Sequence, residues 1–132
     1  MPLKPTDAPL VCIVDDDRSL LRALRTLLTA SGFKVRVFAS GEAFLQSAQA
    51  GRFHCAVIIV DVHLITMSGF DVHDRLKDSG LLVPTIFITG RDDRIIRAHA
   101  HRAGSVAYLT KPFEPHALIA AIQQAVAKGP KA

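Results

Sequence analysis

The sequence predicts an α/β domain in which a doubly wound, five-stranded parallel sheet is covered by five helices. Short apolar runs of strand length alternate with segments of helical periodicity along the whole chain, which is the pattern of βα units. The runs at residues 10–14 and 57–60 are apolar at every position, as in strands that a parallel sheet buries on both faces. The links between elements are short, so we expect parallel strands joined by right-handed crossovers.

The first half of the chain predicts three strands and two helices. A fully apolar strand at residues 10–14 is followed by leucines at helical spacing, until Gly32 ends the helix. Residues 34–38 alternate between polar and apolar, which indicates a half-exposed strand at an edge of the sheet. Ser40 is a suitable N-cap for the next helix. The third strand, at residues 57–60, is fully apolar and is therefore placed in the centre.

The second half predicts three helices and two strands. These are a helix at 69–77, a strand at 83–88, a helix that follows Asp92 and Asp93 and runs to about residue 103, a strand at 105–109 and a helix at about 114–127. We place Asp92 and Asp93 in the first helical turn, where acids are favourable. The predicted domain spans residues 10–127, with short tails at 1–9 and 128–132.

Length and composition allow one compact domain with a substantial core. The chain has 132 residues, of which 49% are hydrophobic, a balance that argues against disorder. No apolar run approaches the roughly 18 residues that a membrane span needs. Residues 1–9 lack the apolar segment of a signal peptide. We therefore expect a cytoplasmic protein with no membrane partner.

Charge and cysteine content narrow the classes of partner. The net charge is +4, but the basic residues are scattered along predicted helices, so we interpret them as solvated faces and expect no direct nucleic-acid binding. The two cysteines, Cys12 and Cys55, do not suggest a disulfide scaffold. If Asp16 and Asp61 lie level on neighbouring strands, the cysteines are offset by about two residues and lie ~8 Å apart, too far for a bridge. We interpret both as small buried hydrophobic residues.

Polar residues with chemical potential follow four of the predicted strands. These are Asp15, Asp16 and Asp17 after the first strand, Asp61 after the third, Thr89 after the fourth and Lys111 after the fifth. Because the carboxyl ends of parallel strands meet at one edge, we expect an acidic cluster, a hydroxyl and an ammonium to share one site. Taken singly, the aspartates could merely cap a helix, and Lys111 could be an ordinary surface lysine. Because all of these residues fall at one edge of the sheet, a shared functional site is favoured over separate capping and surface roles.

The residue types suggest phosphoryl chemistry. Clustered carboxylates repel one another, and a hard divalent cation such as Mg²⁺ relieves that repulsion. A carboxylate beside such a cation can attack phosphorus and form an aspartyl-phosphate. Lys111 would then neutralise charge on the phosphoryl oxygens, to which Thr89 can donate a hydrogen bond.

Four groups of residues resemble the receiver domain of two-component response regulators over about residues 10–127. They are Ile13-Val14-Asp15-Asp16, Asp61 with Met67-Ser68-Gly69, Ile88-Thr89-Gly90, and Tyr108-Leu109-Thr110-Lys111-Pro112-Phe113. The Lys-Pro-Phe ending, with an aromatic residue three positions before the lysine, makes the resemblance specific. A flavodoxin-like strand order of 2-1-3-4-5 is the expected topology.

The resemblance implies a role for each matching residue. Asp61 is the phosphoacceptor, Asp16, Asp61 and the backbone carbonyl of His63 ligate Mg²⁺, Asp15 ligates it through water, and Lys111 contacts the phosphoryl group. Thr89 and Tyr108 form the switch, and the Lys111–Pro112 peptide bond is cis. The chain is then a signalling domain that catalyses its own phosphorylation and dephosphorylation, and is not an enzyme in the usual sense.

The resemblance also implies partners. The phosphoryl donor is a sensor histidine kinase or a phosphotransfer protein. The downstream protein target, or a second copy in a homodimer, binds the face made by the fourth helix, fifth strand and fifth helix.

The sequence departs from the family pattern beside the acceptor. Leu64-Ile65 stands where the family usually has Met-Pro, and loss of that proline is expected to loosen the loop. His63 and Arg91 lie two residues past the acceptor and past the switch threonine, where the family tunes its reaction rates. Arg91 could reach a phosphoryl oxygen.

Two other functions stay open at this stage. Asp15-x-Asp17-x-Ser19 after an apolar strand resembles the nucleophile motif of haloacid-dehalogenase-type phosphatases. That family needs a further acidic motif after the lysine, and only Glu114 follows. The other alternative is an adaptor that works without phosphorylation, against which intact Asp61 and Lys111 argue.

Overall fold

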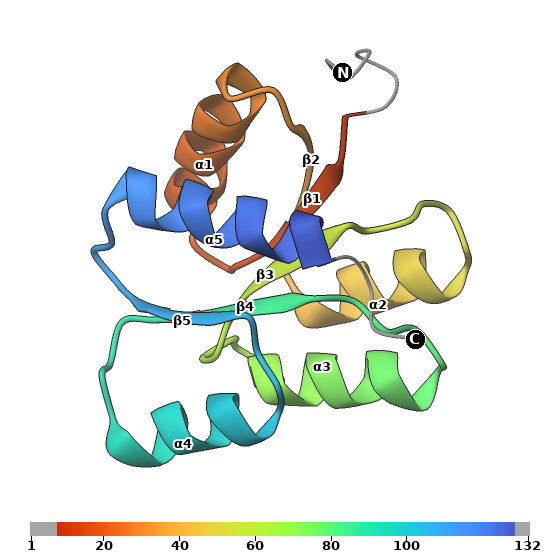
Figure 1. Cartoon of the computed structure of the whole chain (residues 1–132). Coiled ribbons are helices and arrows are strands. Elements are labelled where there is room, and N and C mark those ends of the chain that lie inside the picture. Colours follow the sequence, from red (N-terminus) through yellow and green to blue (C-terminus); the bar gives the residue numbers. More distant parts are fainter. Residues whose placement is uncertain (1–7, 129–132) are drawn as a thin grey trace.

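The computed structural model describes residues 8–128, which form a three-layer α/β domain (Figure 1). The strands are β1 (Leu10–Val14), β2 (Lys34–Phe38), β3 (Val57–Asp61), β4 (Thr85–Thr89) and β5 (Ala107–Thr110). The helices are α1 (Arg18–Ala30), α2 (Gly41–Gln49), α3 (Gly69–Asp78), α4 (Arg94–Arg102) and α5 (Pro115–Lys128). Most of the two predicted tails, residues 1–7 and 129–132, lies outside the described residues.

All neighbouring strands of the sheet are parallel, in the order β2-β1-β3-β4-β5. This confirms the predicted fold and strand order. Every residue of β3 and β4 is buried, whereas β2 lies at the edge with an exposed or half-buried residue at each position. Among the described residues, no helix is long and apolar enough to cross a membrane.

Two hydrophobic cores hold the layers together. The upper core fills the space between the sheet and α1 with α5, and the lower core lies between the sheet and α2, α3 and α4 (Figure 1). Alternate residues of each central strand contribute to opposite cores, so that Ile13 and Ile59 enter the upper one and Val14 and Val60 the lower one. The central strands are therefore apolar at every position because both of their faces are covered.

Side-chain caps fix where the helices begin. Asp17 caps α1, Ser40 caps α2 as predicted, and Ser68 forms a capping box with Asp71 at the start of α3. Asp93 is the N-cap of α4 rather than a residue of its first turn, and Asp92 lies outside the helix. The prediction that both acids belong to the first turn was wrong, because Asp93 lies one position before α4 and Asp92 lies two positions before it.

The register between β1 and β3 corrects the assumption about the cysteines. Val14 pairs with Val60, so Asp15 rather than Asp16 lies level with Asp61. Both thiols are free, Cys12 is fully buried as expected, and Cys55 is only partly buried. Hydrogen bonding to Cys12, together with burial, raises the pKa of the Cys55 thiol above its usual range, so the two side chains interact.

Candidate functional site

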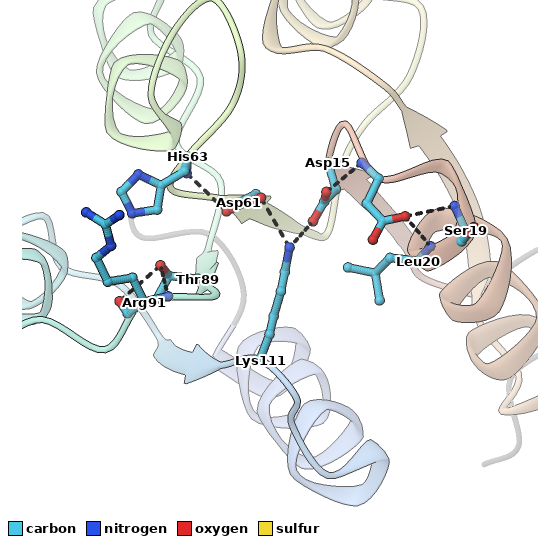
Figure 2. A network of polar contacts seen from close by, with 9 residues as sticks. Asp15, Ser19, Leu20, Asp61, His63, Thr89, Arg91 and Lys111 are labelled. Carbon is cyan, nitrogen blue, oxygen red and sulfur yellow. Dashed lines mark hydrogen bonds and ion pairs between the residues drawn. The ribbon is translucent and has the colours of Figure 1, made fainter.

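The carboxyl ends of the strands bring the predicted polar residues together (Figure 2). Asp15 directly follows β1 and is 0% exposed, and Asp61, the last residue of β3, is 6% exposed. Thr89 ends β4 and is also buried. Lys111 follows β5 and reaches across the ends of the strands toward the two carboxylates. Residues from widely separated parts of the chain thus meet because the sheet is parallel.

Lys111 bridges the two buried carboxylates. Its Nζ donates to Asp15 Oδ2 at 2.8 Å and to Asp61 Oδ2 at 3.2 Å. Burial lowers the pKa of the ammonium, but the hydrogen bonds and charges of Asp15 and Asp61 outweigh burial and raise that pKa overall. The backbone of Lys111 is fixed by a hydrogen bond from its N–H to the Thr89 carbonyl at 2.7 Å, and the Lys111–Pro112 peptide bond is cis.

Asp61 combines burial with two hydrogen bonds. Its Oδ1 accepts from the backbone N–H of His63 at 3.0 Å, while Oδ2 accepts from Lys111. Burial is the largest influence and raises the pKa of this carboxyl, and the nearby charge of Asp15 raises it further. The His63 N–H and the Lys111 ammonium lower the pKa without cancelling the rise. The carboxylate is therefore held in a fixed orientation in a poorly hydrated setting.

The three consecutive aspartates serve two purposes. Carboxylate oxygens of Asp15, Asp16 and Asp61 lie within 4.8 Å of one another and could hold a metal ion. Asp17 does not belong to this group, because its Oδ1 accepts from the backbone N–H groups of Ser19 and Leu20 at 3.0 and 3.2 Å. Several carboxylate oxygens at one open edge suit Mg²⁺, which keeps some water and uses few protein ligands. The donor set therefore fits the predicted cation.

The switch candidates, Thr89 and Tyr108, lie on neighbouring strands near this cluster. The Thr89 hydroxyl accepts from the Arg91 N–H at 3.1 Å and lies 3.2 Å from the Arg91 carbonyl, to which it donates. The Tyr108 hydroxyl is buried without a hydrogen-bond partner among the described residues. The guanidinium of Arg97 lies 5.5 Å from the Tyr108 ring centre. The threonine hydroxyl thus faces its own turn rather than Asp61.

Comparison with known proteins identifies the family. The model of the response regulator receiver domain matches residues 11–123. The chain belongs to the response-regulator receiver family. Among curated relatives, the response regulator protein TmoT of Ectopseudomonas mendocina is 38% identical over 121 residues, which cover 92% of this chain and 54% of the relative. The transcriptional regulatory protein FixJ of Rhizobium meliloti strain 1021 is 37% identical over 115 residues, covering 87% of this chain and 55% of the relative.

Solved structures agree with this assignment. The crystal structure of FixJ-N superposes with a TM-score of 0.82 at 35% identity and covers 90% of this chain and 94% of the other. A receiver protein from Burkholderia phymatum gives 0.80 at 38% identity, with 90% and 95% covered. In contrast to these solved structures, the curated relatives TmoT and FixJ are longer, and the chain spans about half of their length.

Family membership and the position of Asp17 argue against the phosphatase alternative. A haloacid-dehalogenase-like site would use Asp15 and Asp17 together, but the Asp17 carboxylate is committed to capping α1. Asp15 is instead paired with Lys111 and lies beside Asp61. The acidic centre of this receiver is thus built around Asp61.

Two exposed nitrogen-bearing side chains flank the open side of the receiver site. His63 and Arg91 are exposed, and Figure 2 shows the Arg91 side chain extending toward the His63 ring. Each is also tied to the site through its backbone, His63 to Asp61 and Arg91 to Thr89. Their side chains are free to meet a group that arrives at Asp61.

The loop between β3 and α3 follows a defined path. The Gly69 N–H donates to the Val62 carbonyl at 2.9 Å, and His63 pairs with Ser68 in an antiparallel bridge. The Thr66 hydroxyl also bonds to the Glu42 carboxylate at the start of α2. Sequence reasoning missed Glu42, because only the fold brings it to a residue 24 positions away.

Two cavities of the domain lie away from the site. They have volumes of about 230 and 240 Å³ and are lined by residues of the α3–β4 loop, among them Leu81, Leu82 and Val83. These residues precede β4 and so lie at the amino edge of the sheet, opposite Asp61. None of the polar residues of the site lines either cavity.

Proposed function

We propose that Asp61 of this receiver accepts a phosphoryl group from a sensor histidine kinase or a phosphotransfer protein, in a reaction that depends on Mg²⁺. The observation that carries the proposal is the ammonium of Lys111 held 2.8 Å from Asp15 and 3.2 Å from Asp61. A fixed cation beside a buried carboxylate stabilises the negative charge of a transferring phosphoryl group. The receiver region spans residues 10–127.

Transfer of the phosphoryl group to Asp61 forms one bond to phosphorus and breaks another. An Asp61 carboxylate oxygen forms a bond to phosphorus while the bond from phosphorus to the donor imidazole nitrogen breaks, and the electron pair stays on the imidazole. Lys111 Nζ, already beside Asp61 Oδ2, then contacts a phosphoryl oxygen. Asp16, Asp61 and the His63 carbonyl would hold Mg²⁺ directly and Asp15 would hold it through water. The bound ion would supply positive charge beside the phosphoryl oxygens.

Phosphorylation is proposed to change the state of two residues. The Thr89 hydroxyl leaves its hydrogen bonds with the Arg91 backbone and turns to the phosphoryl group, and the Tyr108 ring follows it inward. Ala100 is the one fully buried residue of α4, and the helix also packs through Ile96 and through the His99 ring stacked on Phe70, so movement of α4 would rearrange these contacts. The surface of α4, β5 and α5 would then bind a downstream protein or a second copy of the chain.

The names of relatives add one proposal about the output. FixJ of Rhizobium meliloti is named a transcriptional regulatory protein, so the downstream effect of this receiver is proposed to be control of transcription. We propose that the receiver region itself does not contact nucleic acid, because its Lys and Arg residues are scattered along the helices rather than gathered in one run.

A small acyl-phosphate with Mg²⁺ tests the proposal without knowledge of the kinase. We expect one phosphoryl group per chain and a change of oligomeric state, measured by mass spectrometry and light scattering before and after the reaction. Chelation of Mg²⁺ and the Asp61→Asn variant should both abolish incorporation. If the wild-type chain takes up no phosphoryl group, the adaptor alternative replaces this proposal.

A further inference from the structure

The β3–α3 loop presents a large apolar side chain to solvent beside the acceptor. Ile65 is 84% exposed, more than the other exposed large hydrophobic residues of the described chain, which are Ile95, Leu82 and Leu81. It stands four positions after Asp61. Single exposed apolar residues are common on protein surfaces, so its exposure alone assigns no role.

Contacts made by the residues on both sides of Ile65 hold the loop in place and keep this side chain exposed. Its neighbours on both sides are engaged: Leu64 packs against the lower core, and the Thr66 hydroxyl bonds to Glu42. The loop is closed beyond them by the bridge between His63 and Ser68. Ile65 is therefore held outward at the tip of an anchored loop.

The position of Asp61 determines how a donor approaches. Asp61 is 6% exposed, with the sheet beneath it and Lys111 and Asp15 on one side. A phosphorylated imidazole on a protein can reach it only over the carboxyl edge of the sheet, where the β3–α3 loop forms part of the rim. A donor protein large enough to carry that imidazole covers the rim when the two reacting atoms meet.

We propose that Ile65 is an apolar anchor for the phosphodonor protein, packing into an apolar patch beside its phosphohistidine. The inference rests on the proposed function and names the surface that recognises the donor. The donor surface that packs on this anchor is therefore expected to be apolar at its centre. Removal of the anchor should weaken docking without altering the chemistry at Asp61.

The test compares a protein donor with a small one. The protein donor is an autophosphorylated histidine-kinase core, chosen from a panel as the one that labels the wild-type chain fastest. The small donor is phosphoramidate, which has a phosphorus–nitrogen bond but no protein surface. The variants are Ile65→Ser, the conservative Ile65→Val, and the control Leu82→Ser, which removes an exposed leucine at the opposite edge of the sheet.

We expect Ile65→Ser to raise the KM for the kinase core about 10-fold, while Ile65→Val and Leu82→Ser stay within about 2-fold of wild type. The rate with phosphoramidate should be the same for all of them. An unchanged KM in Ile65→Ser overturns the anchor, as does an equal slowing with phosphoramidate, because the residue then acts on the chemistry. Failure of phosphoramidate to label even the wild-type chain instead overturns the proposed function.

Discussion

The side chains of Asp15, Asp61 and Lys111 are held in place by charge and by hydrogen bonds. Asp61 would repel Asp15 if Lys111 did not lie between them at hydrogen-bond distance from both. The side chains of His63 and Arg91 are exposed at the open side of this cluster.

Arg91→Ala should shorten the lifetime of the phosphorylated form. Its exposed guanidinium can donate two hydrogen bonds to a phosphoryl group, and we propose that it shields the aspartyl-phosphate from water. We expect decay to accelerate by about 2- to 10-fold, measured by loss of label after removal of the donor. Arg94→Ala, which removes an exposed arginine three positions later, is the control. Equal decay in wild type and Arg91→Ala would remove Arg91 from the mechanism.

Cys55 should react slowly with alkylating reagents in the folded protein. Contact with Cys12 and then burial raise its pKa, so the reactive thiolate is scarce near pH 8. Iodoacetamide labelling, followed by mass spectrometry, should be much slower than in urea and should accelerate as the pH rises. Cys12→Ala removes the hydrogen bond that is the larger cause of the raised Cys55 pKa, and it should therefore speed labelling of Cys55.

The raised pKa of Cys55 also makes the free energy of unfolding depend on pH. A thiol whose pKa is raised by folding stabilises the protein fully below its unfolded pKa of about 8.5, and that contribution is lost as the pH rises above it. Labelling of native Cys55 as fast as in urea would contradict the account of this pair.

At the scale of elements, α3 is attached to the acceptor strand by a close backbone contact. A Cβ atom on Gly69, the first residue of α3, would lie 2.5 Å from the Asp61 carbonyl oxygen. The contact is with backbone, which cannot rotate away. Glycine is therefore required where α3 begins, for reasons of space and not of φ.

Gly69→Ala should both destabilise the fold and impair the acceptor. We expect a loss of about 1–3 kcal/mol in the free energy of unfolding, measured by urea denaturation, together with slower phosphoryl uptake because Asp61 is displaced. Gly90→Ala is the matched control for stability, since no atom lies within 4 Å of its added Cβ. A Gly69→Ala variant as stable as wild type would show that the start of α3 can shift at little cost.

The elements were largely predictable because their patterns are strong. Full apolarity placed β1 and β3 in the centre, and alternation placed β2 at the edge, as observed. The ends of elements were less predictable. β5 begins at Ala107, two residues after the predicted start, because strand pairing rather than local apolarity sets the boundary. The register between β1 and β3 was also one residue off, since short apolar runs do not encode their alignment.

At the scale of the whole molecule, the parallel sheet gathers the ends of four strands into one site. That gathering made Asp15, Asp61, Thr89 and Lys111 predictable as neighbours before any coordinates. The sequence could not reveal which carboxylates Lys111 bridges or that the Thr89 hydroxyl binds the Arg91 backbone. These depend on rotamers and on contacts between residues far apart in the chain.

The central claim is that Asp61, among three clustered carboxylates, carries the phosphoryl group. The direct measurement is to label the wild-type chain with an acyl-phosphate and Mg²⁺, trap the aspartyl-phosphate by borohydride reduction, and locate it by peptide mass spectrometry. We expect modification of Asp61 alone in the wild-type chain, no modification in Asp61→Asn, and strongly reduced modification of Asp61 in Asp15→Asn. Modification of Asp15, or uptake that persists in Asp61→Asn, would contradict it.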